Sequence, residues 1–365
     1  MQRTKDSKII LALSGGIDSG MAIRKLKEDG WNNIIAANHV VYDGVKSSSQ
    51  EVLERAAALC RNEGIPFYII DAQKAFAGCV IDNFIESYAG GETPNPCVIC
   101  NENIKFTWFY DAVVKRLIED GKASEGEEIF FATGHYVRLS EKDGNLLPKR
   151  AADRIKDQSY MLYRLPKEIL ERCVFPMGGI IKKELASEAS ALGYSFDSVK
   201  ESQDICFIEG EYGDFIRENA PPSLLKVTPG RIVDTAGNYL GRHKGYVYYT
   251  VGQRKGLSLS DEPWYVISVD SSTNTVVVGR EDEQGRGEFY IEKPNWFIPV
   301  PESLRISCGA VIRYNSSETP CEVEVLPDSA RAKVLLSEDK VITPGQSAVF
   351  YKDDLVLGGG IICRY

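Results

Sequence analysis

The first 200 residues of this 365-residue chain alternate between buried apolar runs and amphipathic helical patterns. Apolar runs with polar ends are typical of strands in a parallel sheet, and apolar residues three or four apart are typical of helices. The runs predict strands at 9–13, 33–41, 67–71 and 128–134, and the spacing predicts helices from residue 17 and over 49–62, 75–88 and 104–118. This alternation predicts an α/β fold with a parallel sheet, whose ligands collect at the carboxyl ends of the strands.

The pattern changes near residue 205. From Pro229 onward, short β-rich runs separated by glycines and prolines predict small sheets or barrels. Examples are 246–251, 264–269 and 275–279. A second set follows at 304–314, 321–326, 331–336, 347–351 and 355–363. We place one boundary near residue 210 and another in the charged stretch 280–288, which predicts domains 1–210, 211–283 and 284–365.

Composition narrows the class of protein. Hydrophobic residues make up 43% of the chain and charged residues 26%, which is typical of a globular protein in water. No apolar run approaches the roughly 18 residues of a membrane-spanning helix, and the polar N-terminus leads directly into the first strand. We therefore expect no signal peptide, no membrane partner and a cytoplasmic location. The nine cysteines are then expected to be free thiols.

Charge changes this picture locally. The net charge of −9 argues against a large basic surface for nucleic acid. Within 228–257, however, cations exceed anions by four, and tyrosines are interleaved with them. Phosphate contacts and base stacking are possible there, and a β surface with routine charges explains the pattern equally well. The cations are Arg231, Arg242, Lys244, Arg254 and Lys255, and the anion is Asp234.

The segment Ser14-Gly15-Gly16-Ile17-Asp18-Ser19 joins the first predicted strand to the first predicted helix. Glycines permit positive φ and a close approach of the backbone to a ligand. A tight turn at a helix N-terminus exposes N–H groups beside the positive end of the helix dipole, which favours an anion. The two serine hydroxyls add donors, and Asp18 is suited to order the turn or to bind a metal ion.

This segment lacks the Gly-Lys-Ser/Thr ending of a Walker A loop and the Gly-x-Gly-x-x-Gly of a dinucleotide-binding turn. It resembles the loop of the ATP pyrophosphatases (the PP-loop), Ser-Gly-Gly-x-Asp-Ser. That resemblance implies cleavage of ATP between its α and β phosphates, transfer of AMP to an oxygen, and displacement of AMP by a nucleophile. The alternative is an ordinary turn between a strand and a helix.

Cysteines supply the second candidate chemistry. Pro94 and Pro96 hold the chain extended before Cys97 and Cys100, a Cys-x-x-Cys pair that leads into a helix. A cysteine near a helix N-terminus is expected to have a lowered pKa, which suits a nucleophile, a redox group or a metal ligand. A closed zinc site needs two further ligands that do not follow nearby. Cys206, where the α/β pattern ends, reads on its own as a buried structural cysteine.

Taken in order, these motifs resemble the bacterial tRNA-specific 2-thiouridylase family (MnmA). The resemblance runs from Ser14 to the C-terminus. It rests on 14–19, 93–96 with Cys100-Asn101, 104–106, 133–136, 156–160, 201–207, 252–256, 313–314 and 344–346. The resemblance implies an adenine-nucleotide α-hydrolase-like parallel-sheet domain followed by two small β-rich domains, with ATP and Mg²⁺ bound. The residues implied to hold ATP are Ala12, Leu13, Ser14, Gly15, Gly16, Ile17, Asp18, Ser19, His39 and Gly134.

The resemblance also implies a reaction, in which sulfur replaces O2 of the wobble uridine in the tRNAs for Lys, Glu and Gln through an adenylated uridine. Cys206 is implied to carry the sulfur as a persulfide, and Cys100 to be its partner nucleophile. A cysteine desulfurase or sulfur-relay protein is the implied sulfur donor. The residues implied to contact tRNA are Asn95, Pro96, Cys97, His135, Lys156, Asp157, Gln158, Arg313, Tyr314 and Gln346.

The chain departs from the family at Cys97, where much of the family has Asp. A thiol does not replace an ionised carboxylate near pH 7. Convergence of Cys97, Cys100 and Cys206 instead suggests a 4Fe-4S cluster with one open iron that holds hydrosulfide. This hypothesis stands beside the persulfide route, in which Cys97 is a bystander.

Two other functional classes stay open at this point. One is an ATP pyrophosphatase that adenylates a small carboxylate or another tRNA base. The other is a non-catalytic iron–sulfur or RNA-binding protein with the same fold. Consumption of ATP without tRNA favours the first, and thiolation that survives Cys206→Ser favours the second or another sulfur site.

Overall fold

The computed structural model describes residues 5–42, 49–184, 205–225, 227–259, 263–301, 303–327 and 330–364. The chain forms two compact units. The first comprises Met1–Val80, Cys97–Phe207 and Asp353–Val356, and the second comprises Ile81–Pro96, Ile208–Lys352 and Leu357–Tyr365. Within the described ranges, no helix is both long and apolar enough to span a membrane.

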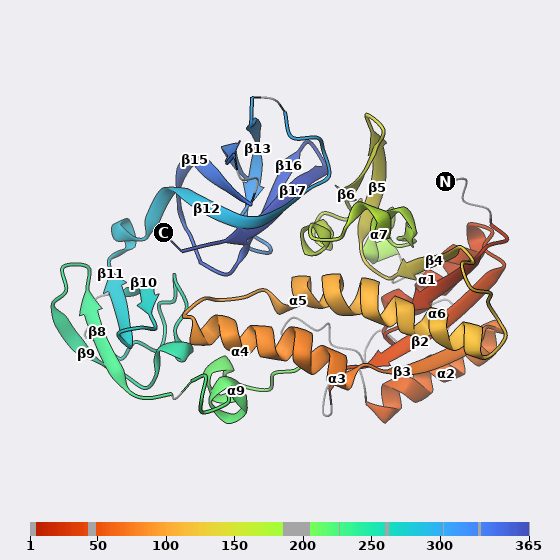
Figure 1. Ribbon diagram of the computed structural model, residues 1–365, viewed down its shortest axis with the longest axis horizontal. Coiled ribbons are helices and arrows are strands. Elements are labelled where there is room, and N and C mark those ends of the chain that lie inside the picture. The colour runs from red at the N-terminus through yellow and green to blue at the C-terminus, as the bar shows by residue number, and fades with distance from the viewer. Residues whose placement is uncertain are drawn as a thin grey trace. The chain divides into compact units, whose positions relative to one another are not determined.

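A five-stranded parallel sheet is the centre of the first unit (Figure 1). Its strand order is β3-β2-β1-β4-β7, so the chain steps outward from β1 to β3 and then returns to the other side of β1. Such a reversal is the position at which open α/β sheets bind ligands. The strands are β1 (Lys8–Ala12), β2 (Asn33–Val40), β3 (Phe67–Asp71), β4 (Ile129–Thr133) and β7 (Cys173–Val174). The predicted parallel α/β fold is confirmed.

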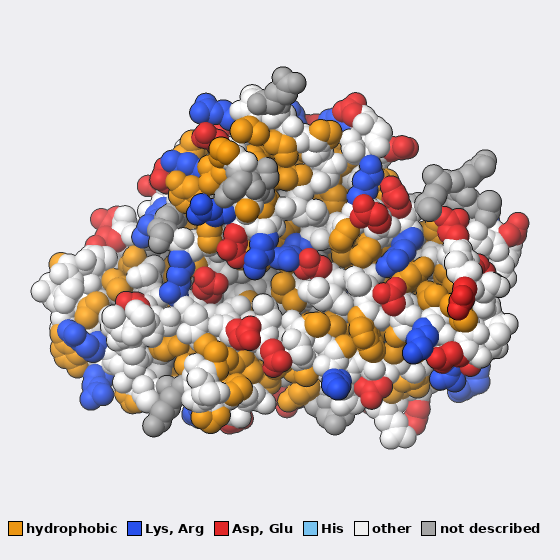
Figure 2. All heavy atoms as spheres, viewed as in Figure 1, with side chains coloured by type: hydrophobic (Ala, Val, Ile, Leu, Met, Phe, Trp, Pro, Cys, Tyr) orange, Lys and Arg blue, Asp and Glu red, His pale blue; other side chains and the backbone are white. Residues whose placement is uncertain are grey.

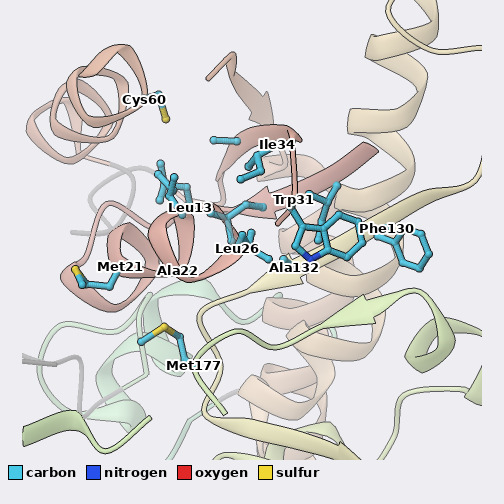
Figure 3. Packing of buried hydrophobic residues seen from close by; sticks show 14 of the residues in the cluster. Leu13, Met21, Ala22, Leu26, Trp31, Ile34, Cys60, Phe130, Ala132 and Met177 are labelled. Atoms are coloured by element: carbon cyan, nitrogen blue, oxygen red, sulfur yellow. The ribbon is translucent and has the colours of Figure 1, made fainter. Parts of the chain in front are cut away.

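Alternate residues of the strands point to opposite faces of the sheet, and both faces are buried by helices. Ile9, Ile34 and Phe130 belong to a cluster on one face that also holds residues of the helices α1 and α2. Trp31 closes this cluster, with its ring 5.3 Å from that of Phe130 (Figure 3). On the other face, Phe131 packs edge-on against Phe106 and other rings of the helical segment 100–119.

The helices of the first unit lie close to the predicted ranges. Ser49 caps α2 by accepting a hydrogen bond from Val52 N, and Gly64 ends it in the left-handed conformation. Two π-helical segments interrupt the helices predicted over 75–88 and 104–118. The bounds are α1 (Ile17–Glu28), α2 (Gln50–Glu63), α3 (Gln73–Phe76), η2 (Ala77–Ile81), α5 (Pro96–Ile99), η3 (Cys100–Trp108), α6 (Phe109–Glu119), η4 (Ser159–Leu162) and α7 (Lys167–Glu171).

The second unit holds α4 (Asp82–Ala89), α9 (Tyr212–Asn219) and two β structures. A four-stranded sheet has the order β10-β11-β8-β9, and pairing of β12 with β17 closes a barrel ordered β12-β15-β14-β13-β16-β17. Closure removes the free edges of a sheet. The elements are β8 (Gly230–Asp234), β9 (Tyr239–His243), η5 (Tyr246–Tyr248), β10 (Tyr265–Asp270), β11 (Thr275–Gly279), η6 (Glu281–Glu283), β12 (Gly285–Trp296), β13 (Arg305–Val311), β14 (Thr319–Val325), β15 (Arg331–Val341), β16 (Ser347–Lys352) and β17 (Leu355–Ile362).

The structure differs from the sequence-based expectations at several elements, and no predicted run that we named covers the strands β7, β8, β9 and β12. The run 246–251 is not a strand but contains the 3-10 helix η5, because Gly245 turns the chain at φ +153° and the Tyr246 hydroxyl donates to Ala89 O. A hairpin of β5 (Val137–Lys142) and β6 (Asn145–Arg150) follows β4, where no strand was predicted.

The segment 81–96, predicted to lie in the first domain, belongs to the second unit. Phe84 of α4 packs edge-on against Tyr212 and Phe215 of α9, which explains its place there. The three-domain division at 210 and 283 stays a prediction.

Candidate functional site

The loop after β1 lies at the carboxyl edge of the sheet, beside the end of β4. Gly15 adopts φ +75°, and a Cβ there would lie 2.5 Å from Val52 Cγ1, so only glycine fits this turn. Gly16 is the N-cap of α1, and the first bond of the helix runs from Gly20 N to Gly16 O. The N–H groups of residues 17–19 have no acceptor within the helix, which leaves them for an anion.

Hydroxyl groups fix the shape of this loop. Ser14 Oγ donates to Ser19 Oγ at 3.1 Å, and Ser19 Oγ donates to Gly16 O at 2.8 Å. A Cβ on Gly134 would lie 3.3 Å from Ser19 Cα, so the end of β4 closely approaches the loop. The structure therefore brings together the predicted loop residues and Gly134.

The Asp18 carboxylate is held by two residues that the sequence analysis missed. Tyr136 Oη donates to Asp18 Oδ1 at 2.8 Å, and Lys182 Nζ lies 2.9 Å from Asp18 Oδ2. Tyr136 was only part of a quoted motif, and Lys182 had no local signal because it lies 164 residues away. Asp18 thus orders the loop, and Lys182 adds a cation beside it. The N–H groups at the start of α1, the hydroxyls and this cation fit a polyphosphate, and Asp18 keeps lone pairs for Mg²⁺.

Two histidines end the strands on either side of the loop. His39 lies at the end of β2, where burial lowers its pKa to about 3 and its ring packs 4.8 Å from that of Phe109. His135 follows β4, and burial holds its pKa well below the usual range. Its Nδ1 is 2.6 Å from Thr133 Oγ1. Both rings are therefore neutral near pH 7 and offer hydrogen bonds rather than charge.

The Cys-x-x-Cys pair lies within a helical segment. Pro96 occupies the first position of α5, where its missing N–H costs nothing. Cys97 follows it, and Cys100 begins the π-helix η3. Residues five apart share a face in a π-helix, which brings Lys105 onto the side of Cys100. Such segments frequently occur at functional sites.

Cys206 reaches the same region through its neighbour. Phe207 is buried and packs edge-on against Phe76 of α3, with ring centres 5.6 Å apart. Helix α3 in turn packs against η3. The Cys206 thiol thereby interacts electrostatically with those of Cys97 and Cys100. The motif residues 201–204 lie outside the described part of the chain.

Burial raises the pKa of all three thiols, to about 12 for Cys100 and about 11 for Cys206. The lowered pKa predicted from the helix N-terminus is therefore wrong, because desolvation outweighs the helix dipole. The side chains of Cys97 and Cys206 retain contact with water. We interpret both thiols as surrounded by protein on most sides but accessible to a reactant from the remaining side.

The positive charge of Lys105 acts on all three cysteines and on both histidines of this site. Lys105 is half-buried and has no ion pair among the residues that the structure describes. Its charge opposes the effect of burial on the thiols and favours neutral rings at the histidines. The groups whose pKa it lowers are Cys97, Cys100, Cys206, His39 and His135. The sequence analysis quoted this residue without assigning it a role.

The three thiols do not form a coordination site in this arrangement. Within the described ranges, no group of three or more His, Cys, Asp or Glu side chains is placed so that it would hold a metal ion. Cysteines hold an iron–sulfur cluster as thiolates that converge on its irons. The arrangement does not fit a 4Fe-4S cluster.

Lys156, Asp157 and Gln158 form a turn whose polar groups mostly serve the fold. Asp157 Oδ1 accepts from Ala151 N at 2.8 Å, and Asp157 Oδ2 accepts from Ser159 Oγ at 2.7 Å. Gln158 Oε1 accepts from Tyr136 N at 3.0 Å. The turn thus stabilises the segment that contains His135 and Tyr136, the residue that donates to Asp18. Its contact with tRNA stays a prediction.

The remaining predicted tRNA residues lie in the second unit. Gln346 Nε2 donates to the carbonyls of Thr93 and Pro94, at 2.8 and 3.2 Å, and so positions the chain before Asn95 and Pro96. Arg313 is exposed, and Tyr314 beside it is partly buried, in the loop between β13 and β14. The structure brings Gln346 and the 93–96 segment together, and it places Arg313 and Tyr314 on the β13–β14 loop.

Surface charge is mixed rather than segregated. On the face shown in Figure 2, the coloured Lys and Arg side chains are interspersed with Asp and Glu. Within the 228–257 segment, Lys244 pairs with Glu211 and lies 3.9 Å from the ring of Tyr248, whereas Arg254 and Lys255 are exposed. The local basic excess is therefore partly neutralised.

Comparison with known proteins covers nearly the whole chain. Three family models match in order: a tRNA methyl transferase HUP domain over residues 7–210, a tRNA methyl transferase PRC-barrel domain over 215–280 and an aminomethyltransferase beta-barrel domain over 286–362. A U34-tRNA thiolase NcsA from Methanococcus maripaludis, solved with its 4Fe-4S cluster, aligns with a TM-score of 0.32 and 17% identity over 60% of this chain and 68% of its own. It is too distant to support an argument.

Curated relatives are much more similar. A tRNA-specific 2-thiouridylase MnmA 2 from Clostridium botulinum is 37% identical over 97% of this chain and 98% of its own length. A tRNA-specific 2-thiouridylase MnmA from Chloroflexus aurantiacus is 38% identical over 98% and 99%. With the loop, the strand ends and the cysteines in place, the chain belongs to the tRNA-specific 2-thiouridylase MnmA family.

Proposed function

We propose that this protein uses ATP to replace O2 of the wobble uridine of tRNA with sulfur. The observation that carries the proposal is the pairing, in one unit, of a PP-loop at the sheet switch point with the thiols of Cys100 and Cys206. The loop would bind the ATP that activates O2 of the uridine, and the thiols would carry the sulfur that replaces this oxygen. The tRNAs for Lys, Glu and Gln are the proposed substrates.

The first step activates the base. O2 of the uridine attacks the α-phosphorus, the bond to the bridging oxygen of the β-phosphate breaks, and pyrophosphate leaves. A carbonyl oxygen is a poor leaving group, whereas AMP is a good one. Backbone N–H groups after Ser14 and the cation of Lys182 would stabilise the phosphate charge. Mg²⁺ would add charge neutralisation, and Asp18 is a carboxylate of the loop that would hold it.

Neutral histidines suit nucleotide binding beside this loop. His39 at the end of β2 would contact the adenine, and Gly134 would allow the nucleotide to approach β4. Because their pKa values are lowered, both His39 and His135 donate and accept hydrogen bonds without placing a charge against a base.

The second step delivers sulfur. The terminal sulfur of a persulfide on Cys206 attacks C2 of the adenylated uridine, and AMP leaves. Cys100 Sγ then attacks Cys206 Sγ and breaks the S–S bond, so that the transferred sulfur stays on C2. The products are 2-thiouridine and a Cys100–Cys206 disulfide, which an external thiol reduces. A protein persulfide is the proposed sulfur source, and Asn95 to Cys97 would frame the base.

No step is derived through an iron–sulfur cluster, because the thiol arrangement does not fit one. Anaerobic purification followed by iron analysis and an absorption spectrum tests this directly. An iron-free, colourless protein that thiolates tRNA supports the persulfide route. Stoichiometric iron that is lost in Cys97→Ser, together with the activity, overturns it.

The activity itself is tested by incubating the protein with tRNA, ATP and a persulfide donor, and then analysing nucleosides by mass spectrometry. We expect 2-thiouridine at position 34 and equimolar AMP. A methylated nucleoside formed with a methyl donor would favour the transferase named by the family models. ATP cleavage without tRNA would favour a different PP-loop substrate. Cytoplasmic location and the identity of the sulfur donor stay predictions.

A further inference from the structure

Two cysteines outside the proposed site face each other across the β13–β14 hairpin. Cys308 and Cys321 are directly opposed partners in this antiparallel pair. Their sulfur atoms are 3.6 Å apart. Cys308 is half-exposed, and Cys321 is buried. The proposed thiolation mechanism uses neither residue.

The backbone already allows these thiols to be joined. Opposed residues in an antiparallel pair have Cα atoms about 4.5 or 5.5 Å apart. Both separations fall within the roughly 4.4–6.8 Å that disulfides span. The sulfur atoms must approach by about 1.5 Å, which side-chain rotation supplies without moving the strands.

A disulfide between Cys308 and Cys321 would close a covalent ring that contains the β13–β14 loop. The ring would contain residues 309–320, including Arg313 and Tyr314 at the turn of the hairpin. The flanking pair is also linked, because Ser307 Oγ donates to Glu322 across the two strands. The Ser307–Glu322 bond therefore already links the two strands next to Cys308, on the side away from the turn. The disulfide would restrain the turn itself, which contains Arg313.

We propose that Cys308 and Cys321 form a reversible disulfide by exchange with a low-molecular-weight disulfide, and that closing this ring changes tRNA binding by the Arg313 loop. The second half rests on the proposed function. Cys308 attacks the small disulfide and releases one thiol, and Cys321 then attacks Cys308 Sγ and releases the second. Two protein thiols are oxidised, one small disulfide is reduced, and the released thiols take up the two protons.

The order and rate of these attacks follow from the surroundings. Cys308 is the accessible thiol and reacts first. Its pKa is raised, chiefly by the hydrogen bond with Cys321, then by burial and by the charges of Glu322 and Glu318. The exchange is therefore slow near pH 7 and accelerates as pH rises, since the thiolate is the attacking form.

The test uses the full chain, reduced and then incubated with oxidised glutathione at alkaline pH without oxygen. Digestion without reductant followed by mass spectrometry is expected to yield a linked Cys308–Cys321 peptide pair that dithiothreitol separates. Fluorescence anisotropy at one ionic strength then compares tRNA affinity before and after oxidation. We expect a change of about threefold or more, or about 0.6 kcal/mol.

Cys308→Ser, treated identically, is expected to show no change in affinity, which separates this site from oxidation of Cys100 or Cys206. Cys79→Ser, at another exposed cysteine, is the matched control that keeps the linked peptide. Failure of the linked peptide to form overturns the disulfide. A linked peptide with unchanged affinity overturns the effect on tRNA. A linked peptide in a protein that binds no tRNA in either state overturns the proposed function alone.

Discussion

At the scale of single residues, burial of the cysteine thiols opposes their reactivity. In the proposed reaction Cys100 attacks as a thiolate, and Cys206 must be a thiolate when it accepts sulfur from a persulfide donor, yet burial raises the pKa of both. Lys105 counters this at each thiol, and its charge is the only opposing influence that acts at all three among the described residues. Reactivity is therefore expected to depend on pH and on this one cation.

The first prediction concerns pH. Because the pKa of Cys100 is about 12 and that of Cys206 about 11, the thiolate fraction of each should rise about tenfold per pH unit between pH 7 and 9. Alkylation of each cysteine by iodoacetamide, followed by peptide mass spectrometry, is expected to show this slope. A rate that levels off below pH 9 would contradict it, and urea-unfolded protein provides the reference with an ordinary thiol.

The second prediction removes the cation. Lys105→Met should slow alkylation of Cys100 and Cys206 near pH 8 by about three- to tenfold, because loss of a nearby positive charge raises the thiol pKa further. Lys105→Arg should restore most of the rate, since it keeps the charge. Lys115→Met, at an exposed lysine of α6, is the matched control. Equal slowing in Met and Arg variants would indicate a packing role instead.

At the scale of elements, the first unit depends on close approach between the end of β4 and the PP-loop. Gly134 lies against Ser19, whose hydroxyl bonds to Ser14 and Gly16. The shape of the anion site is thus set by contact between two strand ends as well as by the loop sequence.

The third prediction tests that contact. In Gly134→Ala the new Cβ would lie 3.3 Å from Ser19 Cα and 3.4 Å from Ser19 N, so the loop must shift by a few tenths of an ångström. We expect ATP affinity to fall about tenfold, or about 1.4 kcal/mol, while the thermal midpoint changes little. Gly179→Ala, with open space around it, is the control. Unchanged ATP binding by calorimetry would show that the loop tolerates the shift.

The elements also show how far sequence reasoning reaches. The runs at 9–13 and 33–41 predicted β1 and β2 because buried parallel strands need apolar residues on both faces. The run 246–251 was wrongly predicted as a strand because its Tyr, Val and Thr residues have high β-propensity. The hydrogen bond from Tyr246 to Ala89, by contrast, depends on a residue 157 positions away. The π-helical register of η3 differs from an α-helix by one residue per turn, too little to read from apolar spacing.

The site divides in the same way. The PP-loop was predictable because its chemistry is local to six residues. The meeting of Cys206 with Cys100 was expected only through family resemblance, since it depends on Phe207 packing against Phe76. The Lys182–Asp18 pair had no local signal at all. These contacts depend on packing between residues far apart in the chain, which the periodicity of apolar residues does not indicate.

At the scale of the whole molecule, an acidic protein is proposed to bind a polyanion. The net charge is −9, and the basic excess of 228–257 is partly neutralised by Glu211. Few phosphate contacts are then available, so affinity should depend on a small number of exposed cations and on base contacts. The salt dependence of tRNA binding should accordingly be shallow.

The fourth prediction isolates one such cation. Arg313 is exposed on the β13–β14 loop, and among the described residues its side chain has no ion pair. Arg313→Ala should lower tRNA affinity and reduce the slope of log affinity against log salt by about one, the signature of one lost phosphate contact. Arg305→Ala, at an exposed arginine of β13 paired with Glu324, is the matched control and should leave the slope unchanged. A fall in affinity with an unchanged slope would mean that Arg313 contacts a base, and no fall would remove this loop from the tRNA interface.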